Sequence, residues 1–288
     1  MSSKGIQIHK LPDLKDPLLI AGFDGWGNAL KISSGMATYL IRTFKAQGFA
    51  ELDPDVFFRY DERRPVVNIE EGRFIDLSSP GGTFYAAHTA PDGRDLVILK
   101  ADEPNLRWFG FVDELLNLCS RLHIETIINL GSMYDHVLHT DRILSAIASN
   151  VELSAMLKQK GVNAISYQGP SAIHSTIHSE ALKRDLACIS LWCHCPYYLQ
   201  GTTHFGILAH LGKMLAAIGG FDLNIEDLES NWEKLNVQIE NLIENNAELQ
   251  AVISELRKAK VRGAAARMTG AIKSDEKIIN IQDFLQPK

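Results

Sequence analysis

The sequence predicts an α/β fold in which a mainly parallel sheet is sandwiched by helices and followed by a C-terminal helical extension. Two features lead to this prediction. Short apolar runs of strand length alternate with segments of helical spacing, which is the pattern of buried parallel strands joined by helices. Beyond Gly219-Gly220 the strand-like runs stop and the apolar residues follow a 3,4 spacing. The predicted organisation is an α/β domain over 1–220, a helical hairpin over 221–266 and a loose basic tail over 267–288.

The first predicted unit is a strand, a glycine turn and a helix. Residues 18–23 (LLIAGF) are a continuous apolar run, and DGWGN follows them. The helix after the turn has apolar positions four residues apart from Met36 to Phe44. Strand ends followed by glycine turns, at 22–27 and at Gly131, are expected at one edge of the sheet, where open α/β folds bind ligands.

An antiparallel insertion is predicted over 54–100. Glu71-Gly72 is a two-residue turn signal between two strand-like runs, and Pro91-Asp92-Gly93 stands between another two. These runs predict a strand over 56–60 and two hairpins, which pair 66–69 with 73–77 and 83–88 with 96–99. Downstream, the periodicity predicts helices over 106–122, 140–159, 171–184 and 203–218 and strands over 126–131, 163–168 and 187–193.

The helical extension has two readings. Apolar residues recur at a 3,4 spacing from Ile225 to Leu256, with Asn246 at an apolar-face position. One continuous coiled coil with a polar seam residue fits this register. A helical hairpin broken near Asn245-Asn246 fits the low helix propensity of that pair. We favour the hairpin, packed on the domain or on a neighbouring subunit.

The composition is that of a globular protein. The chain has 288 residues, 45% of them hydrophobic and 22% charged, and a formal net charge of −6. A net acidic chain argues against nucleic acid as the main partner, although residues 257–288 carry 8 Lys and Arg against 3 Asp and Glu. No apolar run reaches about 18 residues and no export signal is recognisable, so we expect a cytoplasmic protein without a membrane partner. The four cysteines lie in apolar stretches, which predicts buried, reduced thiols.

Several motifs that carry known chemistry are absent from the sequence, namely GxxxxGK[ST], GxSxG, HExxH and paired CxxC, so neither cofactor nor metal is predicted. Arg63-Arg64 and Arg107 are nevertheless unusual. Arginines beside carboxylates can clamp an anion, or they can form an Arg–carboxylate network inside the fold. The clamp would suit an enzyme or small-molecule binder in which His139 or a carboxylate transfers a proton. The candidate carboxylates are Asp24, Glu62, Asp102 and Glu103.

Six segments also occur in an order that is typical of one family. They are GFDGWGNA (22–29), FRYDERRPVV (58–67), ADEPNLRWFGF (101–111), NLGSMYDHVLHTDR (129–142), YQGPSAIHS (167–175) and SLWCHCPYYL (190–199). The chain thereby resembles the proteasome assembly chaperone family, in its bacterial branch of uncharacterised members. The likeness runs from about residue 17 to residue 218, and 224–262 resembles the helical extension of that branch.

The resemblance implies a phosphorylase/hydrolase-like α/β sandwich and a homo-oligomer, for which a trimer is the first guess. In archaeal and eukaryotic relatives it implies a role in assembling proteasome α-rings, and it implies no catalytic residues. We therefore predict a non-catalytic, chaperone-like or scaffold protein that binds itself and another protein complex, with the anion-holding cleft as the alternative. The positions that match the family, carried over as a candidate pocket or family signature, are Asp24, Trp26, Arg63, Arg64, Pro65, Glu103, Pro104, Arg107, Trp108, His139 and Thr140.

Overall fold

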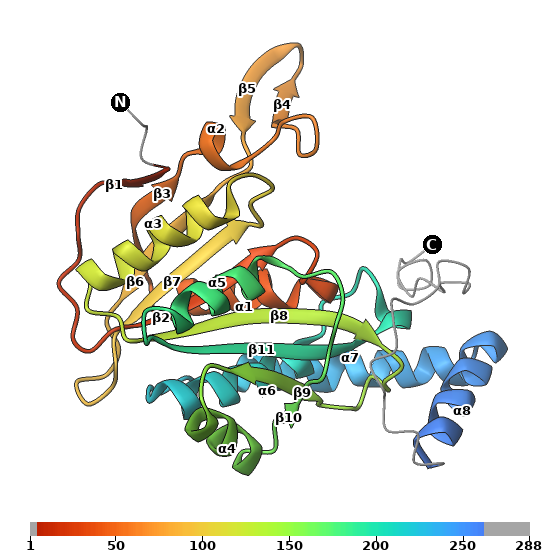
Figure 1. Cartoon of the computed structure of the whole chain (residues 1–288). Coiled ribbons are helices and arrows are strands. Elements are labelled where there is room, and N and C mark those ends of the chain that lie inside the picture. Colours follow the sequence, from red (N-terminus) through yellow and green to blue (C-terminus); the bar gives the residue numbers. More distant parts are fainter. Residues whose placement is uncertain (1–4, 262–288) are drawn as a thin grey trace.

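A computed structural model describes residues 5–261, which fold around one nine-stranded sheet (Figure 1). The strands are β1 (Ile6–Ile8), β2 (Leu18–Asp24), β3 (Gln47–Leu52), β4 (Val66–Glu70), β5 (Arg73–Ser78), β6 (Gly82–Ala87), β7 (Leu96–Asp102), β8 (Thr126–Asp135), β9 (Leu144–Ala148), β10 (Asn163–Ala164) and β11 (Ala187–Pro196). The helices are η1 (Ala29–Lys31), α1 (Ile32–Thr43), α2 (Pro54–Phe57), α3 (Trp108–Arg121), α4 (Val151–Gln159), α5 (Ile173–Leu182), η2 (Tyr197–Leu199), α6 (Phe205–Gly219), α7 (Glu226–Glu244) and α8 (Ala247–Val261).

The sheet has a parallel centre and antiparallel flanks. Its strand order is β1-β3-β6-β7-β2-β8-β11-β9-β10, and β7, β2, β8 and β11 run parallel to one another. On one flank β1, β3 and β6 are antiparallel, and on the other β9 is antiparallel to β11. The predicted α/β class and the antiparallel insertion are confirmed.

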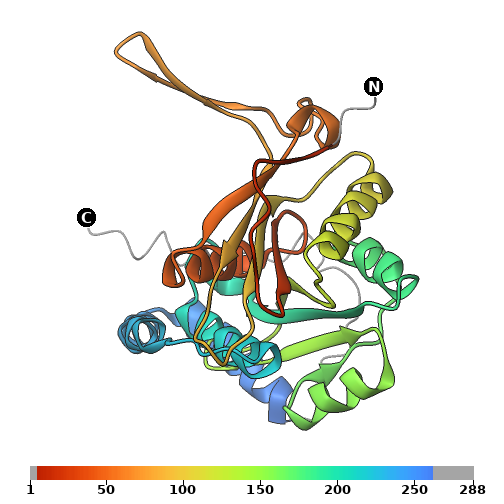
Figure 2. The ribbon, with the colours of Figure 1, turned by 90° about the vertical axis from the view of Figure 1, so that its left-hand side faces the viewer.

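Helices cover both faces of this sheet, so successive residues of a central strand enter two different cores. In β2, Ile20 belongs to the core that contains residues of α1, α6, α7 and α8, whereas Leu19 belongs to the core under α3 and α5. Figure 2 shows α3 and α5 on one side of the sheet and α1, α6 and the extension on the other. A strand buried on both faces needs apolar residues throughout, which is why 18–23 reads as one apolar run.

The extension is two helices that share the first of these cores. Asn246 separates them, because its side-chain oxygen accepts hydrogen bonds from the backbone N–H groups of Glu248 and Leu249 at 3.0 and 3.1 Å and so caps α8. Ile239 and Ile253 are buried in the same core as Ile20. The predicted break near Asn245-Asn246 is therefore present, and both helices pack on the α/β body. The predicted basic tail, 267–288, lies outside the described residues.

Four predicted elements are wrong in whole or in part. The strand predicted over 163–168 is limited to the two residues of β10. Residues 56–60 are not a strand, because Asp53 accepts from the Asp55 N–H at 3.0 Å and Pro54 occupies the first turn, which starts α2. The helix predicted over 140–159 is confined to α4, since Leu144–Ala148 pairs with β11 instead. Gly131 is not a turn residue: it lies inside β8, where Trp192 packs over it. The edge strand β1 and its neighbour β3 were not predicted.

The predicted hairpin at Glu71-Gly72 is confirmed, and it projects far from the body (Figures 1 and 2). Glu71 and Gly72 have φ values of 50° and 78°, as a type I′ turn requires of both central residues. We call residues 66–78 the arm. Every residue of β4 and β5 is exposed, so the arm lies outside both cores.

Two predictions from composition can also be compared with the structure. All four cysteines are free and buried, which confirms the predicted thiols. Among residues 5–261, none of the helices is both long enough and apolar enough to cross a membrane.

Candidate functional site

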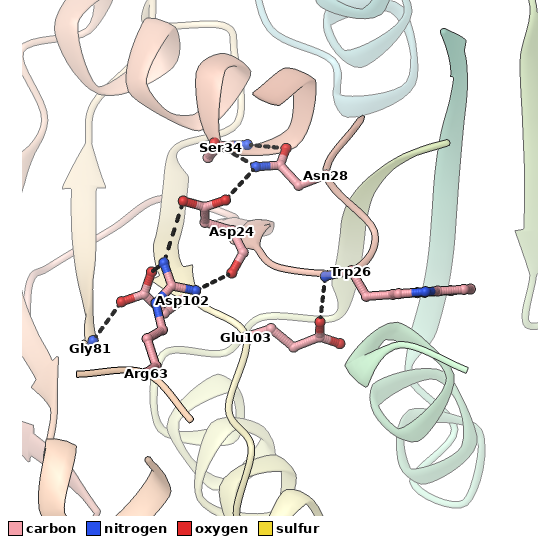
Figure 3. A network of polar contacts seen from close by, with 8 residues as sticks. All are labelled: Asp24, Trp26, Asn28, Ser34, Arg63, Gly81, Asp102 and Glu103. Atoms are coloured by element: carbon pink, nitrogen blue, oxygen red, sulfur yellow. Dashed lines mark hydrogen bonds and ion pairs between the residues drawn. The ribbon is translucent and has the colours of Figure 1, made fainter. Parts of the chain in front are cut away.

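Three of the predicted polar residues meet where the arm joins the sheet. Asp24 and Asp102 end the neighbouring strands β2 and β7 in register. The Arg63 guanidinium contacts the Asp102 carboxylate, lies 3.5 Å from Asp24 Oδ2 and donates to the Asp24 carbonyl at 3.1 Å (Figure 3). On the other side of the arm, Asp102 Oδ2 accepts from the Gly81 N–H at 2.9 Å. We call Asp24, Arg63, Gly81 and Asp102 the clasp, because they hold both ends of the arm.

The charges of the clasp largely satisfy one another. One guanidinium lies between two carboxylates, so the charge of Arg63 is paired within the protein although its side chain is 39% exposed. Burial raises the pKa of Asp102, and the Gly81 hydrogen bond and Arg63 oppose that shift. For Arg63 the structure therefore shows the internal Arg–carboxylate network, one of the two readings left open by the sequence.

Glu103 joins two further elements beside the clasp. Its Oε2 accepts from the Trp26 N–H at 3.0 Å, and its Oε1 accepts from the Ile173 N–H at 2.8 Å in the first turn of α5. An anionic carboxylate at a helix amino terminus is favourable, because unpaired N–H groups gather there. A Cβ atom on Gly25 would lie 2.5 Å from Glu103 Oε2, so this close approach requires glycine. The Trp26 ring itself is 65% exposed.

Asn28 extends the network into α1 (Figure 3). Its Nδ2 donates to Asp24 Oδ1 at 3.0 Å and to Ser34 Oγ at 2.9 Å, while its Oδ1 accepts from the Ser33 N–H at 2.9 Å. Sequence reasoning missed this residue. The signal was an asparagine ahead of the serine pair at the start of a helix, which is typical of N-terminal capping.

The remaining predicted residues of this edge are more peripheral. Arg64 and Arg107 are exposed, and Arg107 has a φ of 53° where it precedes α3. The Trp108 Nε1–H donates to the Pro104 carbonyl within its own loop. These residues flank the clasp without joining it.

His139 and Thr140 lie in a different place, the loop between β8 and β9. His139 Nδ1 is 2.8 Å from the Tyr198 hydroxyl, and its Nε2 is 3.0 Å from Glu240 Oε1 on α7. The Tyr198 hydroxyl and the Glu240 carboxylate are satisfied together when His139 is neutral and Nε2 carries its proton. Burial lowers the pKa of His139, although the Glu240 carboxylate raises it. Thr140 is exposed.

A wider set of polar groups surrounds His139. Its carbonyl oxygen accepts from the Arg142 guanidinium at 2.9 Å and lies 3.0 Å from His204 Nε2. The Trp232 ring of α7 stacks on His204 at 4.6 Å and receives the Arg142 cation at 4.3 Å from its centroid. This body–extension joint comprises His139, Arg142, Tyr198, His204, Trp232 and Glu240. Of these six residues, only His139 was predicted from the sequence.

A third polar chain, also not predicted, links three strands. His194 Nδ1 lies 2.7 Å from Asp135 Oδ2 and its Nε2 lies 2.6 Å from Ser145 Oγ. Serine, histidine and aspartate are the residues of an acyl-transfer triad, in which the serine attacks the substrate and the aspartate is buried. Here the serine is the buried member: Ser145 is 4% exposed, whereas the Asp135 side chain is 18% exposed. Ser145 also lies within β9, paired to β11 on one side and β10 on the other. We interpret the chain as a fastening between β8, β11 and β9.

Comparison with known proteins places the chain in a family. The sequence model of the PAC2 family matches residues 19–243. The chain belongs to the PAC2 family. No sequence among the curated proteins matches this PAC2 chain.

Solved structures share the PAC2 fold. A PAC2 family protein from Streptomyces avermitilis has a TM-score of 0.74 at 23% identity, covering 83% of this chain and 100% of that one. A proteasome-assembly chaperone homologue from Mycobacterium tuberculosis has a TM-score of 0.75 at 24% identity, covering 82% and 99%. Pyrococcus furiosus PbaB, an archaeal proteasome activator, has a TM-score of 0.64 at 18% identity, covering 82% and 97%. At these identities the likeness concerns the fold.

In this PAC2 protein, predicted site residues thus lie in two separate polar centres, with Asp24 and Arg63 in one and His139 in the other. The clasp holds the arm, and the joint holds the extension. Among residues 5–261, no group of three or more His, Cys, Asp or Glu side chains has an arrangement that could hold a metal ion.

Proposed function

We propose that this PAC2-family protein is a cytoplasmic, chaperone-like or scaffold protein that acts as a homo-oligomer and binds proteins rather than converting a small molecule. The arm carries this proposal, because it holds large apolar side chains in solvent. Apolar surface gathered outside the core is typical of protein interaction sites. The names of two similar structures, a proteasome-assembly chaperone homologue and a proteasome activator, support the same kind of function. The exposed apolar residues of the arm are Val66, Val67, Ile69, Phe74, Ile75 and Leu77.

The paired charges of the clasp also support the proposal. Of the three arginines predicted to hold an anion, Arg63 has its charge neutralised by Asp24 and Asp102, whereas Arg64 and Arg107 are exposed. Asp102 also holds the chain at Gly81, where it returns from the arm. Charged residues of the candidate site therefore position a protein-binding element at the carboxyl edge of the sheet.

The proposal is tested by purifying the tagged full chain from cells of its source organism and analysing its complexes by size and mass spectrometry. We expect an oligomer or a stoichiometric complex with another protein. Phe74→Glu should weaken it, whereas the matched control Asn68→Glu, which adds the same charge to the same arm, should not. A monomer without any partner that is saturably stabilised by a small anion would contradict the proposal and favour the alternative cleft.

Deleting α7 and α8 is a poor test of the same idea. Residues of both helices, including Ile239 and Ile253, are buried in the core of the α/β body. Their removal would expose that core, so loss of a partner could not be separated from loss of the fold. Substitutions on the arm avoid this difficulty, because the arm lies outside both cores.

A further inference from the structure

The arm has one apolar and one polar face. Residues directly opposite each other in an antiparallel pair share a face. Val67 lies opposite Leu77, and Ile69 lies opposite Phe74 with Ile75 as the extra residue of a bulge. The other face carries the Val66–Ser78 and Asn68–Asp76 pairs. We call Val67, Ile69, Phe74, Ile75 and Leu77 the apolar face.

A hairpin of this kind requires a covering surface. Two strands alone are at best marginally stable in water, because they have no apolar layer to pack against. The five side chains of the apolar face are between 47% and 66% exposed. They present on the order of 500 Å² of surface per arm, compared with roughly 800 Å² that each partner of a stable interface buries.

Matching apolar surface lies at the base of the same arm. Trp26 is in the loop after β2, Tyr60 precedes Arg63, and Phe109 is in the first turn of α3; all three rings are exposed. The segments meet there, since Glu103 binds the Trp26 N–H and Asn105 accepts from the Arg59 N–H at 2.7 Å. These rings add roughly 400 Å², which brings one copy to about the area that a stable interface buries per partner.

We propose that the apolar face of the arm packs on a second copy of this chain, at the pole that carries Trp26, Tyr60 and Phe109. Every copy has both surfaces, so the arm meets its complement whenever two copies approach pole to pole. At about 3.4 Å per residue, the six residues of β5 extend roughly 20 Å beyond the base. This inference rests on the proposed function in that it takes the arm to be a protein-binding element.

The first test measures the mass of the full chain by analytical ultracentrifugation over a concentration series. The variant Ile69→Glu/Leu77→Glu places one charge on each strand of the apolar face. Its matched control, Asn68→Glu/Ser78→Glu, places the same two charges on the polar face. We expect self-association to weaken at least about tenfold in the first variant and to remain at the wild-type level in the second. A monomeric wild type, or equal association in all three proteins, would overturn the inference.

The second test keeps the arm intact and probes proximity. Phe74→Cys puts an exposed thiol on the apolar face and Asp76→Cys puts one on the polar face, while the four native thiols are buried. Each of these variants is mixed with Phe109→Cys, which puts a thiol on the pole. A short bis-maleimide should link Phe74→Cys on one copy to Phe109→Cys on the other, and it should not link Asp76→Cys to Phe109→Cys. Equal linking at both positions would contradict the proposed contact.

The proposed function and the contact between copies can fail separately. If the apolar-face variant keeps its oligomer but loses a stoichiometric foreign protein, the arm binds that protein and this inference is wrong while the proposed function stands. If the variant loses neither, the arm is not a protein-binding element: this inference is wrong, and another surface holds the oligomer or the partner. The proposed function itself is wrong if the wild type is a monomer without a protein partner.

Discussion

Replacing Arg63 by alanine tests whether the clasp holds the arm in place. The guanidinium contacts Asp102, lies 3.5 Å from Asp24 Oδ2 and donates to the Asp24 carbonyl at 3.1 Å. In Arg63→Ala, two carboxylates at the ends of adjacent strands lose the cation between them. The end of the arm that enters β4 also loses its contact with the sheet.

The magnitude follows from the partial burial of the clasp. The Arg63 side chain is 39% exposed and that of Asp102 is 20% exposed, so the pair is neither on the open surface nor fully buried. Exposed ion pairs contribute about 0.2–1 kcal/mol, and removing one partner of a buried pair costs about 3–5 kcal/mol. We therefore expect the free energy of unfolding to fall by about 2 kcal/mol and Tm to fall by about 4–8 °C.

The assay compares Arg63→Ala with its neighbour Arg64→Ala in thermal and urea unfolding. Arg64 is exposed, so its removal changes the net charge equally and should alter stability by less than about 0.5 kcal/mol. Amide hydrogen exchange in the arm should quicken only in Arg63→Ala. Adding Asp102→Asn should recover part of the loss, because it removes the uncompensated charge while keeping an acceptor for Gly81. Equal losses in the two alanine variants, or unchanged exchange in the arm, would refute this reasoning.

Three further predictions concern the core and the joint. Burial lowers the pKa of His204 to about 3, so below about pH 6.5 the unfolded chain binds a proton that the folded chain does not. The contribution of His204 to the free energy of unfolding is therefore full above that pH and falls below it. Between pH 7 and pH 5 this one group lowers the free energy of unfolding by about 2 kcal/mol. His204→Gln should remove this pH dependence from the free energy of unfolding in urea. Gly131→Ala places a Cβ atom 2.7 Å from the Trp192 ring and should cost about 1–3 kcal/mol, measured by urea unfolding. Ile239→Ala empties a fully buried site on α7 and should lower the free energy of unfolding by about 2–5 kcal/mol, measured by urea unfolding as a single, cooperative transition; two separate transitions would show that the extension folds independently.

The parts of the fold that could be predicted are those with local causes. The apolar run 18–23 marks a strand buried on both faces, and Glu71-Gly72 marks a tight turn because two successive positive φ values are needed. Asn246 marks the break in the extension because it caps the next helix. In each case the residues that set the conformation are neighbours in the chain.

The parts that could not be predicted depend on distant partners. Leu144–Ala148 has a helix-compatible pattern, and pairing with β11 decides that it is a strand. Ser145, Asp135 and His194 form one hydrogen-bonded chain although His194 is 49 and 59 residues from the other two. The start of α2 is different, since Asp53 followed by Pro54 is a local signal for the first turn of a helix, and the predicted strand over 56–60 ignored it.

The clasp and the joint have a common arrangement. The arm and the extension are the two elements that depart from the sheet, and each is attached by a polar network at its base. Asp24, Arg63 and His139 were predicted as parts of one candidate pocket or family signature, and all three lie in these attachments rather than around one cleft. A residue that holds an element in its orientation also affects the affinity of that element for its binding partner. Arg63→Ala should therefore weaken the contact between copies although the apolar face is unchanged, and adding Asp102→Asn should restore association together with stability. Association that stays at the wild-type level while stability falls would separate the clasp from the function of the arm.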